Sequence, residues 1–133
     1  MSMRGVVFGV CVEGWVSVAL RVKGEKRSLH GHDYVVRVCA EGGLDEAGMV
    51  VDHSILYRLL RGCLDSLDYQ VLNDVLEAES ATAERLVGYV YNCVAPKLKD
   101  YADASIVYVE ACTPRGYCSY LRAGTTYTPR KRG

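Results

Sequence analysis

Two histidines separated by a single residue could together hold a metal ion. His30 and His32 flank Gly31 in the segment LHGHDY, which opens a run rich in β-branched residues. Side chains two positions apart on a strand project from the same face of the sheet, so both imidazoles would point into one site. Histidine nitrogens are common zinc ligands, and a metal site is one interpretation of the pair. The other interpretation is two surface histidines at a strand end, which is the usual outcome for an isolated pair.

The elements that must position these histidines are predicted in the order strand, strand, helix, helix, strand, strand. Gly14 is expected to mark a bulge or bend in the first strand, and Asp52 and Ser80 are expected to cap the two helices. Hairpin-linked strands with helices segregated between them indicate an α+β fold, here an antiparallel four-stranded sheet (ββααββ) with two helices on one face. Strands are expected over residues 4–22, 29–41, 105–110 and 117–127, and helices over residues 53–66 and 81–97.

The composition is that of an ordinary folded domain. Sixteen basic residues balance sixteen acidic ones in a chain of 133, so the net charge favours neither nucleic acid nor a membrane as a partner. No apolar run reaches the ~18 residues that a membrane helix needs, and the N-terminal segment has no signal-peptide pattern. A cytoplasmic location is therefore expected. One domain is expected over residues 1–128, followed by a basic, solvated tail over residues 129–133.

The cysteines allow two interpretations. No two of them form a C-x-x-C pair, so a zinc ribbon is not indicated. Buried free thiols are the preferred interpretation, because free cysteine is among the most buried residue types. One or two disulfides are the alternative, since intracellular disulfides are common in hyperthermophiles, and the scarcity of Asn and Gln agrees with a thermophilic source. The six residues are Cys11, Cys39, Cys63, Cys93, Cys112 and Cys118.

A series of short motifs surrounds the histidine pair. The segments are 17–22 (SVALRV), 29–34 (LHGHDY), 48–53 (GMVVDH), 67–73 (LDYQVLN), 81–84 (ATAE) and 107–113 (VYVEACT). In order and content they resemble the 6-pyruvoyl-tetrahydropterin synthase family. In that family a strand with S-A-A-H-R-L precedes L-H-G-H-N-Y, and G-M-V-x-D-F, L-D-H-x-x-L-N, P-T-A-E and a strand ending in glutamate follow. The resemblance extends over nearly the whole chain.

The resemblance implies the tunnelling fold, in which subunits assemble through their sheets into barrels, commonly as hexamers of two trimers with interface active sites. It also implies zinc-dependent carbon–oxygen or carbon–carbon lyase chemistry on substrates of the dihydroneopterin triphosphate type. Related members make 6-carboxytetrahydropterin. The expected partners are therefore a pterin-type small molecule and further copies of the chain, in a trimer or a hexamer.

The metal ligands implied by the resemblance are incomplete. The family's zinc is held by three histidines, of which two match His30 and His32, whereas the third position is Leu20. Two imidazoles alone give a weak site, because catalytic zinc usually has three protein ligands. His53 stands where the family has phenylalanine and is a candidate replacement ligand, as are Asp33 and the cysteines. Packing in place of that phenylalanine is the simpler interpretation of His53.

The proton-transfer residues implied by the resemblance are altered as well. The position of the family's catalytic cysteine falls on Lys26, and the neighbouring Glu25 is a candidate base, although a solvated charged turn is the simpler interpretation. The family's Asp-His pair matches Asp68 and Tyr69. Tyrosine, with a pKa of about 10, can donate a proton but is a poor base, so the relay is changed.

The pterin-binding residues implied by the resemblance are present. Glu110 matches the strand-end glutamate that binds the pterin, and a carboxylate opposite two adjacent N–H donors forms a strong bidentate pair. Thr82 matches a threonine that contacts the pterin, and Glu84 follows in the same motif. Ordinary first-turn chemistry is the alternative for Thr82 and Glu84, because acidic residues favour a helix N-terminus.

Two classes of function follow from these residues. The first is an enzyme in which His30 and His32 hold zinc, Glu110 positions the ring, and the altered relay moves protons. The second is a catalytically silent paralogue that binds a pterin or purine-like ligand, or serves as an oligomeric scaffold. The family's standard mechanism cannot run with these replacements, so activity has to be argued from the site itself.

Overall fold

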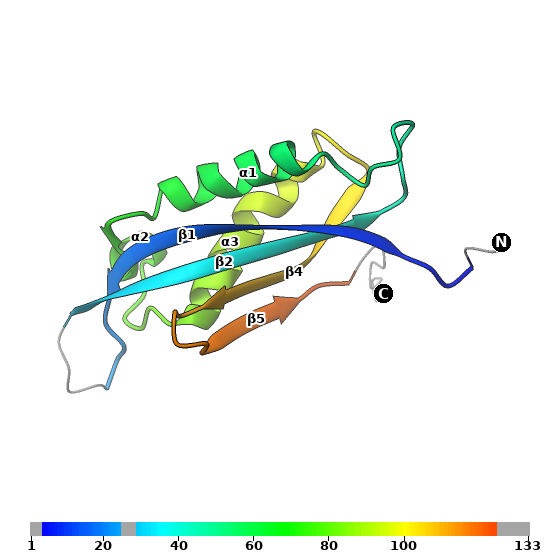
Figure 1. The fold of residues 1–133 in the computed structure, drawn as a ribbon. Helices are drawn as coiled ribbons and strands as arrows, with labels where there is room; N and C mark the ends of the chain where they lie inside the picture. Colours follow the sequence, from blue (N-terminus) through cyan, green and yellow to red (C-terminus); the bar gives the residue numbers. More distant parts are fainter. Residues whose placement is uncertain (1–3, 25–28, 125–133) are drawn as a thin grey trace, which may run out of the picture.

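Five strands form one mixed sheet, and helices cover one of its faces (Figure 1). The computed structural model describes residues 4–24 and 29–124. The strands are β1 (Phe8–Leu20), β2 (His30–Gly42), β3 (Gln70–Val71), β4 (Ala104–Cys112) and β5 (Cys118–Arg122), and the helices are α1 (His53–Asp65), α2 (Leu72–Leu76) and α3 (Ala83–Leu98). The spatial order is β3-β1-β2-β4-β5; β3 runs parallel to β1 and the other pairs are antiparallel. The α+β prediction is confirmed, and the sheet of one chain does not close into a barrel.

The two faces of the sheet have different surroundings. Even-numbered side chains of β1 and β2, such as Val16, Val36 and Val38, are buried under the helices. Odd-numbered side chains, such as Trp15, lie on the other face, which no described helix covers (Figure 1). We call this second surface the open face. From β4 and β5 it carries Tyr108, Glu110, Cys112, Cys118, Tyr120 and Arg122, which the strand register places side by side.

Helices α1 and α3 cover the sheet with their apolar stripes. Asp52 caps α1 as predicted, and its carboxylate accepts a hydrogen bond from the Ser54 backbone N–H. The cap of α3 is Thr82 and not Ser80, because the Thr82 hydroxyl accepts the Arg85 N–H while the Ser80 hydroxyl accepts the Lys23 N–H. No described helix is long and apolar enough to span a membrane.

Gly14 is not at a bulge, which was one of the two alternatives predicted for this position. The β1–β2 register is continuous through the Gly14–Val36 pair. A Cβ at this position would lie 3.0 Å from Leu64 Cδ1 of α1, so the missing side chain lets the helix approach the strand closely. The described sheet instead has an irregularity where β2 pairs with β4, between Cys39 and Ala40.

The prediction of four strands and two helices missed the short elements β3 and α2. These elements are held to the end of β1 by Asn73, which is 5% exposed. Its Nδ2 donates to the carbonyl oxygens of Arg21, Ala78 and Glu79, and its Oδ1 accepts the Arg21 N–H. One amide therefore bonds four backbone groups where the chain turns back onto the sheet edge, and its two N–H hydrogens are shared among the three carbonyl oxygens.

The preferred prediction of buried free thiols was wrong, because all six cysteines are paired. Cys11–Cys39 joins β1 to β2 and Cys112–Cys118 joins β4 to β5, both between directly opposed residues on the open face. Cys63–Cys93 joins α1 to α3 on the other side of the sheet. Burial suggested thiols, but opposed positions on neighbouring strands bring sulfur atoms close enough to bond, and sequence alone did not give that register.

Candidate functional site

The histidine pair lies at the start of β2, on the face that the helices cover. The ring centroids of His30 and His32 are 4.8 Å apart, and those of His32 and Tyr34 are 5.7 Å apart. Leu20 lies directly opposite His30 in the antiparallel register, and Val18 lies opposite His32. The three positions that the family resemblance assigned to zinc, Leu20, His30 and His32, therefore share one face. The ligand set still does not fit catalytic zinc, which usually has three protein ligands, because Leu20 is an apolar side chain that is 3% exposed.

The start of α3 approaches this end of the sheet. The Ala81 N–H donates to the Arg21 carbonyl oxygen, which ties the segment before α3 to the end of β1. Burial and the nearby Glu84 carboxylate raise the pKa of the Tyr34 phenol. Glu84 therefore lies near the histidine side of the sheet. Thr82 lies at the same helix start, where its hydroxyl caps the helix.

Asp68 and Tyr69 follow α1 and connect it to β1. Asp68 Oδ1 accepts the Ser17 N–H at 2.9 Å, and its Oδ2 lies 3.6 Å from the Arg61 guanidinium. The Tyr69 N–H donates to the Ser17 carbonyl oxygen, and Tyr69 has a left-handed backbone with φ of 61°. The Tyr69 side chain is 85% exposed. Asp68 therefore fixes the backbone of β1, while the Tyr69 phenol faces solvent in the single chain.

A hollow of about 440 Å³ lies beside Tyr69 at the edge of the sheet. Its wall includes Ser17, Gly31 and Asp33, and the Ser17 hydroxyl donates to Asp33 Oδ1 at 2.6 Å. The hollow also borders His32. Three of the residues proposed from the sequence therefore lie beside this hollow, namely Tyr69, Asp33 and His32.

Glu110 lies on the open face of β4 and is partly buried. Its Oε1 accepts a hydrogen bond from the Tyr108 hydroxyl at 2.7 Å, and its Oε2 lies 3.1 Å from Cys112 Sγ. The hydrogen bond to Glu110, together with partial burial, raises the pKa of Tyr108. The Tyr108 ring lies 5.5 Å from that of Tyr120, and the Arg122 guanidinium lies over both rings.

Three residues of this cluster were not predicted from the sequence, namely Tyr108, Tyr120 and Arg122. The sequence pattern that could have predicted them is the alternation along the two strands, which places residues 108, 110, 120 and 122 on one face of a hairpin. That signal depends on the β4–β5 register, in which Tyr108 pairs with Arg122 and Glu110 with Tyr120. The turn between the strands had to be located before the register could be assigned.

Glu110 and the histidine pair lie far apart within one chain. Glu110 pairs with Arg37 on the open face, whereas His32 faces the helices five residues earlier on β2. Five residues of strand span about 17 Å. A site that uses both groups therefore cannot be assembled from a single chain.

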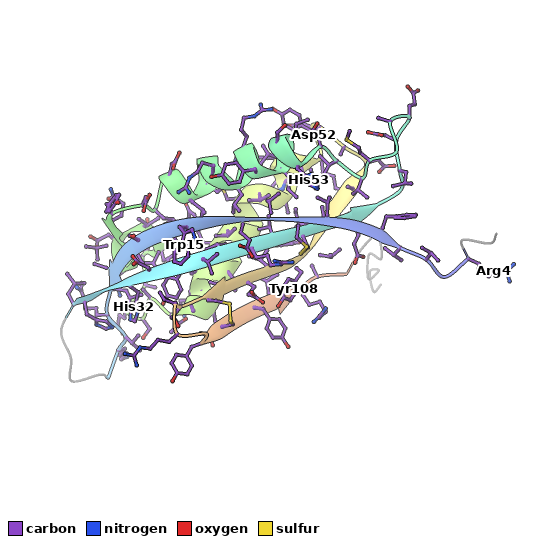
Figure 2. The ribbon with its side chains drawn as sticks, in the orientation of Figure 1. Arg4, Trp15, His32, Asp52, His53 and Tyr108 are labelled. Carbon is purple, nitrogen blue, oxygen red and sulfur yellow. A yellow bond between two sulfur atoms is a disulfide. The ribbon has the colours of Figure 1, made fainter. Side chains whose placement is uncertain are left out.

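His53 is not near the other two histidines. It begins α1 at the opposite end of the sheet, as Figure 2 shows for His53 and His32. The hollow beside His53 is lined by Phe8 and Gly9 of β1, about 30 Å along the strand from the residue opposite His32. The candidate role of His53 as a third ligand with His30 and His32 is therefore not supported within one chain.

Glu25 and Lys26 lie outside the described residues, as does the expected basic tail. Within residues 4–24 and 29–124, one group of at least three metal-ligating side chains converges, and it contains Glu110, Cys112 and Cys118 but no histidine.

The chain matches a known family over most of its length. A model of the 6-pyruvoyl tetrahydropterin synthase family matches residues 16–123. A 6-pyruvoyl tetrahydrobiopterin synthase of Dictyostelium discoideum is 33% identical over 86 residues, a match that covers 61% of this chain and 64% of that relative. An Archaeoglobus fulgidus protein described as a 6-carboxy-5,6,7,8-tetrahydropterin synthase is 30% identical over 83 residues, covering 61% of this chain and 70% of the relative.

The fold agrees with a solved structure. The 6-pyruvoyl tetrahydropterin synthase of Caenorhabditis elegans superposes with a TM-score of 0.70 at 23% identity, over 89% of this chain and 96% of the other. At this identity the match shows that the two chains share a fold.

Proposed function

The chain belongs to the 6-pyruvoyl tetrahydropterin synthase family, and from this premise we propose that it binds a pterin through Glu110 while lacking the family's zinc-dependent mechanism. Its similarity to pterin-processing relatives supports a role in pterin metabolism. The observation that carries the proposal is the Glu110 carboxylate, fixed on the open face by the Tyr108 hydroxyl.

The hydrogen-bond acceptors and aromatic rings around Glu110 match the donors and the flat ring of a pterin. An ionised carboxylate has about four acceptor positions, so the hydrogen bond from Tyr108 leaves both oxygens able to accept further N–H donors. Two adjacent N–H groups of a pterin match this carboxylate in a bidentate, charge-assisted pair. The neighbouring Tyr108 and Tyr120 rings offer aromatic surface beside the carboxylate. Dihydroneopterin triphosphate is the substrate type that we propose for this site.

The residues at the family's zinc-binding and proton-transfer positions support an altered reaction or none. Leu20 occupies the third zinc position, so no step is assigned to a metal here. Tyr69 replaces the relay histidine, and a phenol does not accept protons readily near neutral pH. Asp68 is engaged with the Ser17 N–H and the Arg61 guanidinium. These observations favour the second candidate function, a pterin-binding paralogue without lyase activity, over an active lyase.

Self-association belongs to the proposal. Glu110 and His32 face opposite sides of the sheet in one chain, so a site containing both groups would need a second copy. A trimer or hexamer that closes the open sheet into a barrel is the arrangement we propose, and light scattering of the purified chain measures its mass. A monomer at micromolar concentration would contradict this part of the proposal.

The binding proposal is tested by titrating the oxidised protein with dihydroneopterin triphosphate and with neopterin, following pterin fluorescence. We expect saturable binding that weakens more than about tenfold in Glu110→Gln, since one charge-assisted pair is lost. Glu13→Gln is the matched control, because Glu13 is a glutamate of the same face whose carboxylate pairs with Arg37. Unchanged binding in Glu110→Gln, or no binding to the wild-type protein, would reject the proposal. Product analysis in the same samples distinguishes an active lyase from a silent one.

A further inference from the structure

We propose that Glu110, Cys112 and Cys118 form a zinc site on the open face when the Cys112–Cys118 disulfide is reduced. One ligand atom from each of these residues lies within 4.8 Å of the others. In the oxidised chain the two sulfurs are bonded to each other, and Glu110 Oε2 lies 3.1 Å from Cys112 Sγ. Reduction therefore releases two sulfur ligands beside a carboxylate that is already in place.

The backbone holds the two cysteines together without the disulfide. Cys112 and Cys118 are directly opposed in the β4–β5 ladder, and four further residue pairs continue that ladder to Tyr108 and Arg122. The connecting turn has its own hydrogen bonds, from the Thr113 N–H to the Tyr117 carbonyl oxygen and from the Gly116 N–H to the Thr113 carbonyl oxygen. Directly opposed side chains on antiparallel strands have Cβ atoms about 5 Å apart, which suits two ligands of one metal ion.

Tyr108 orients the carboxylate toward the sulfurs. Its hydroxyl donates to Glu110 Oε1 and leaves Oε2 on the side of Cys112. Hydrogen bonds of this kind from a neighbouring residue commonly fix the orientation of metal ligands. The nearby cations have partners of their own, since Arg37 pairs with Glu13 and Arg122 lies over Tyr108 and Tyr120. Tyr108 is therefore a positioning residue for the proposed site.

The site opens by thiol–disulfide exchange with a dithiol. The attacking thiolate bonds to one cysteine sulfur as the S–S bond breaks and the other cysteine leaves as a thiolate. The second thiol of the reductant then attacks the reductant's sulfur in this mixed disulfide, and the first cysteine leaves as a thiolate. The reductant becomes a disulfide and both protein cysteines become thiols. Cys118 is exposed and gives the reductant access, whereas Cys112 is 9% exposed. On binding zinc the thiols lose two protons to solvent.

The ligand set favours zinc over harder cations. Two thiolates and one carboxylate are ligands that zinc accepts, and a water molecule can complete a tetrahedral site. Calcium and magnesium prefer all-oxygen sites. The proposed site is separate from the histidine pair, which lies on the other face of the sheet. A bound ion would also occupy the carboxylate assigned to pterin; this consequence rests on the proposed function, whereas metal binding itself does not.

The test is cobalt and zinc titration of the full chain after reduction with dithiothreitol and its removal without oxygen. Cobalt bound to thiolates gives a charge-transfer absorption that histidine and carboxylate ligands do not give. We expect this absorption to saturate near one equivalent in the reduced protein, to be absent in the oxidised protein, and to be displaced by zinc. In Cys118→Ser the affinity should fall more than about tenfold, and in Glu110→Gln it should fall by about tenfold or more.

Matched variants make the result specific. Cys39→Ser removes a cysteine of the other disulfide on the open face and should leave the absorption unchanged, as should the double variant His30→Ala, His32→Ala. Circular dichroism checks that each variant is folded, and Glu110→Gln keeps both cysteines if Cys118→Ser does not fold. The proposal is overturned if the reduced wild type gives no thiolate–cobalt absorption. It is also overturned if Cys39→Ser abolishes the absorption, or if Glu110→Gln binds as tightly as the wild type.

Discussion

Leu20 lies directly opposite His30 across the β1–β2 ladder, and both side chains face the helices. The register therefore places a leucine where a third imidazole would complete a set with His30 and His32. The backbone for a three-histidine site is present, and one side chain distinguishes this face from a zinc site. The difference from the family's ligand set is local and does not involve the fold.

Replacing that leucine should create zinc affinity. Leu20→His places an imidazole beside His30 on the same face, giving three protein ligands, the number typical of catalytic zinc. We expect Leu20→His to bind about one equivalent of zinc at least ~10-fold more tightly than the wild type, and zinc to raise its melting temperature. Calorimetric titration and thermal unfolding measure the two effects.

Ala19→His is the control for this substitution. Ala19 is adjacent in sequence but lies opposite Gly31 with its side chain on the open face, so the new imidazole points away from His30. Equal zinc affinities for Leu20→His and Ala19→His would show that the register does not define the metal position. The measurements use the oxidised protein, in which no cysteine can bind the ion.

Gly14→Ala should destabilise the protein. The added methyl would lie 3.0 Å from Leu64 Cδ1, and Leu64 is fully buried. Overpacking of this kind costs about 1–3 kcal/mol in the free energy of unfolding. Gly62→Ala on α1 is the contrasting variant, because a Cβ there meets no atom within 4 Å. Higher helix propensity should stabilise Gly62→Ala by about 0.5–1 kcal/mol. Urea unfolding of both variants checks the opposite signs.

Asn73→Ala should have a larger effect on stability than most polar substitutions. The variant leaves three carbonyl oxygens and the Arg21 N–H without their amide partner at a buried position. We expect a loss of about 2–4 kcal/mol in the free energy of unfolding. Asn92→Ala, on the exposed side of α3, serves as the control and should change stability by less than about 0.5 kcal/mol. A small effect of Asn73→Ala in urea unfolding would contradict the role assigned to its amide.

Asp52 should make stability depend on pH. Hydrogen bonds from the Ser54 side chain and backbone lower the pKa of Asp52 below its ordinary value of 3.8. A carboxyl with a lowered pKa in the folded state stabilises the fold above 3.8, and this contribution is lost as the pH falls through the folded-state pKa. Asp52→Ala should therefore melt below the wild type at pH 7, and the difference should shrink in acid.

Asp52→Asn separates the cap from the charge. Asparagine is also a good N-cap, so this variant should keep most of the stability at neutral pH and lose the pH dependence at position 52. Melting curves from neutral pH down to about pH 3 follow both variants through the range where aspartate titrates. A constant gap between Asp52→Ala and wild type across this range would show that the carboxylate charge contributes nothing.

The sequence predicted those parts of the fold that depend on local pattern. Alternating β-branched residues predicted β1 and β2. The cap residue Asp52 predicted the start of α1 at His53. The short elements β3 and α2 were missed, because two strand residues and five helix residues are too few to show a period. Their position depends on contacts with the distant end of β1, made through Asn73 and Asp68.

The candidate site was predicted as residue types but not as an arrangement. The spacing of His30 and His32 correctly placed them on one face, since alternation alone decides this. Whether that face lies toward the helices, and whether Glu110 shares it, depends on strand order and register. The same applies to the pairing of Cys112 with Cys118, since six cysteines allow 15 pairings.

The three disulfides also have a simple order along the chain. Cys11 pairs with Cys39, Cys63 with Cys93 and Cys112 with Cys118, so each bridge closes before the next begins and no two loops overlap. Each bridge therefore lies within one local unit, a strand hairpin or the α1–α3 helix pair, and none of the three pairings requires another to be made first.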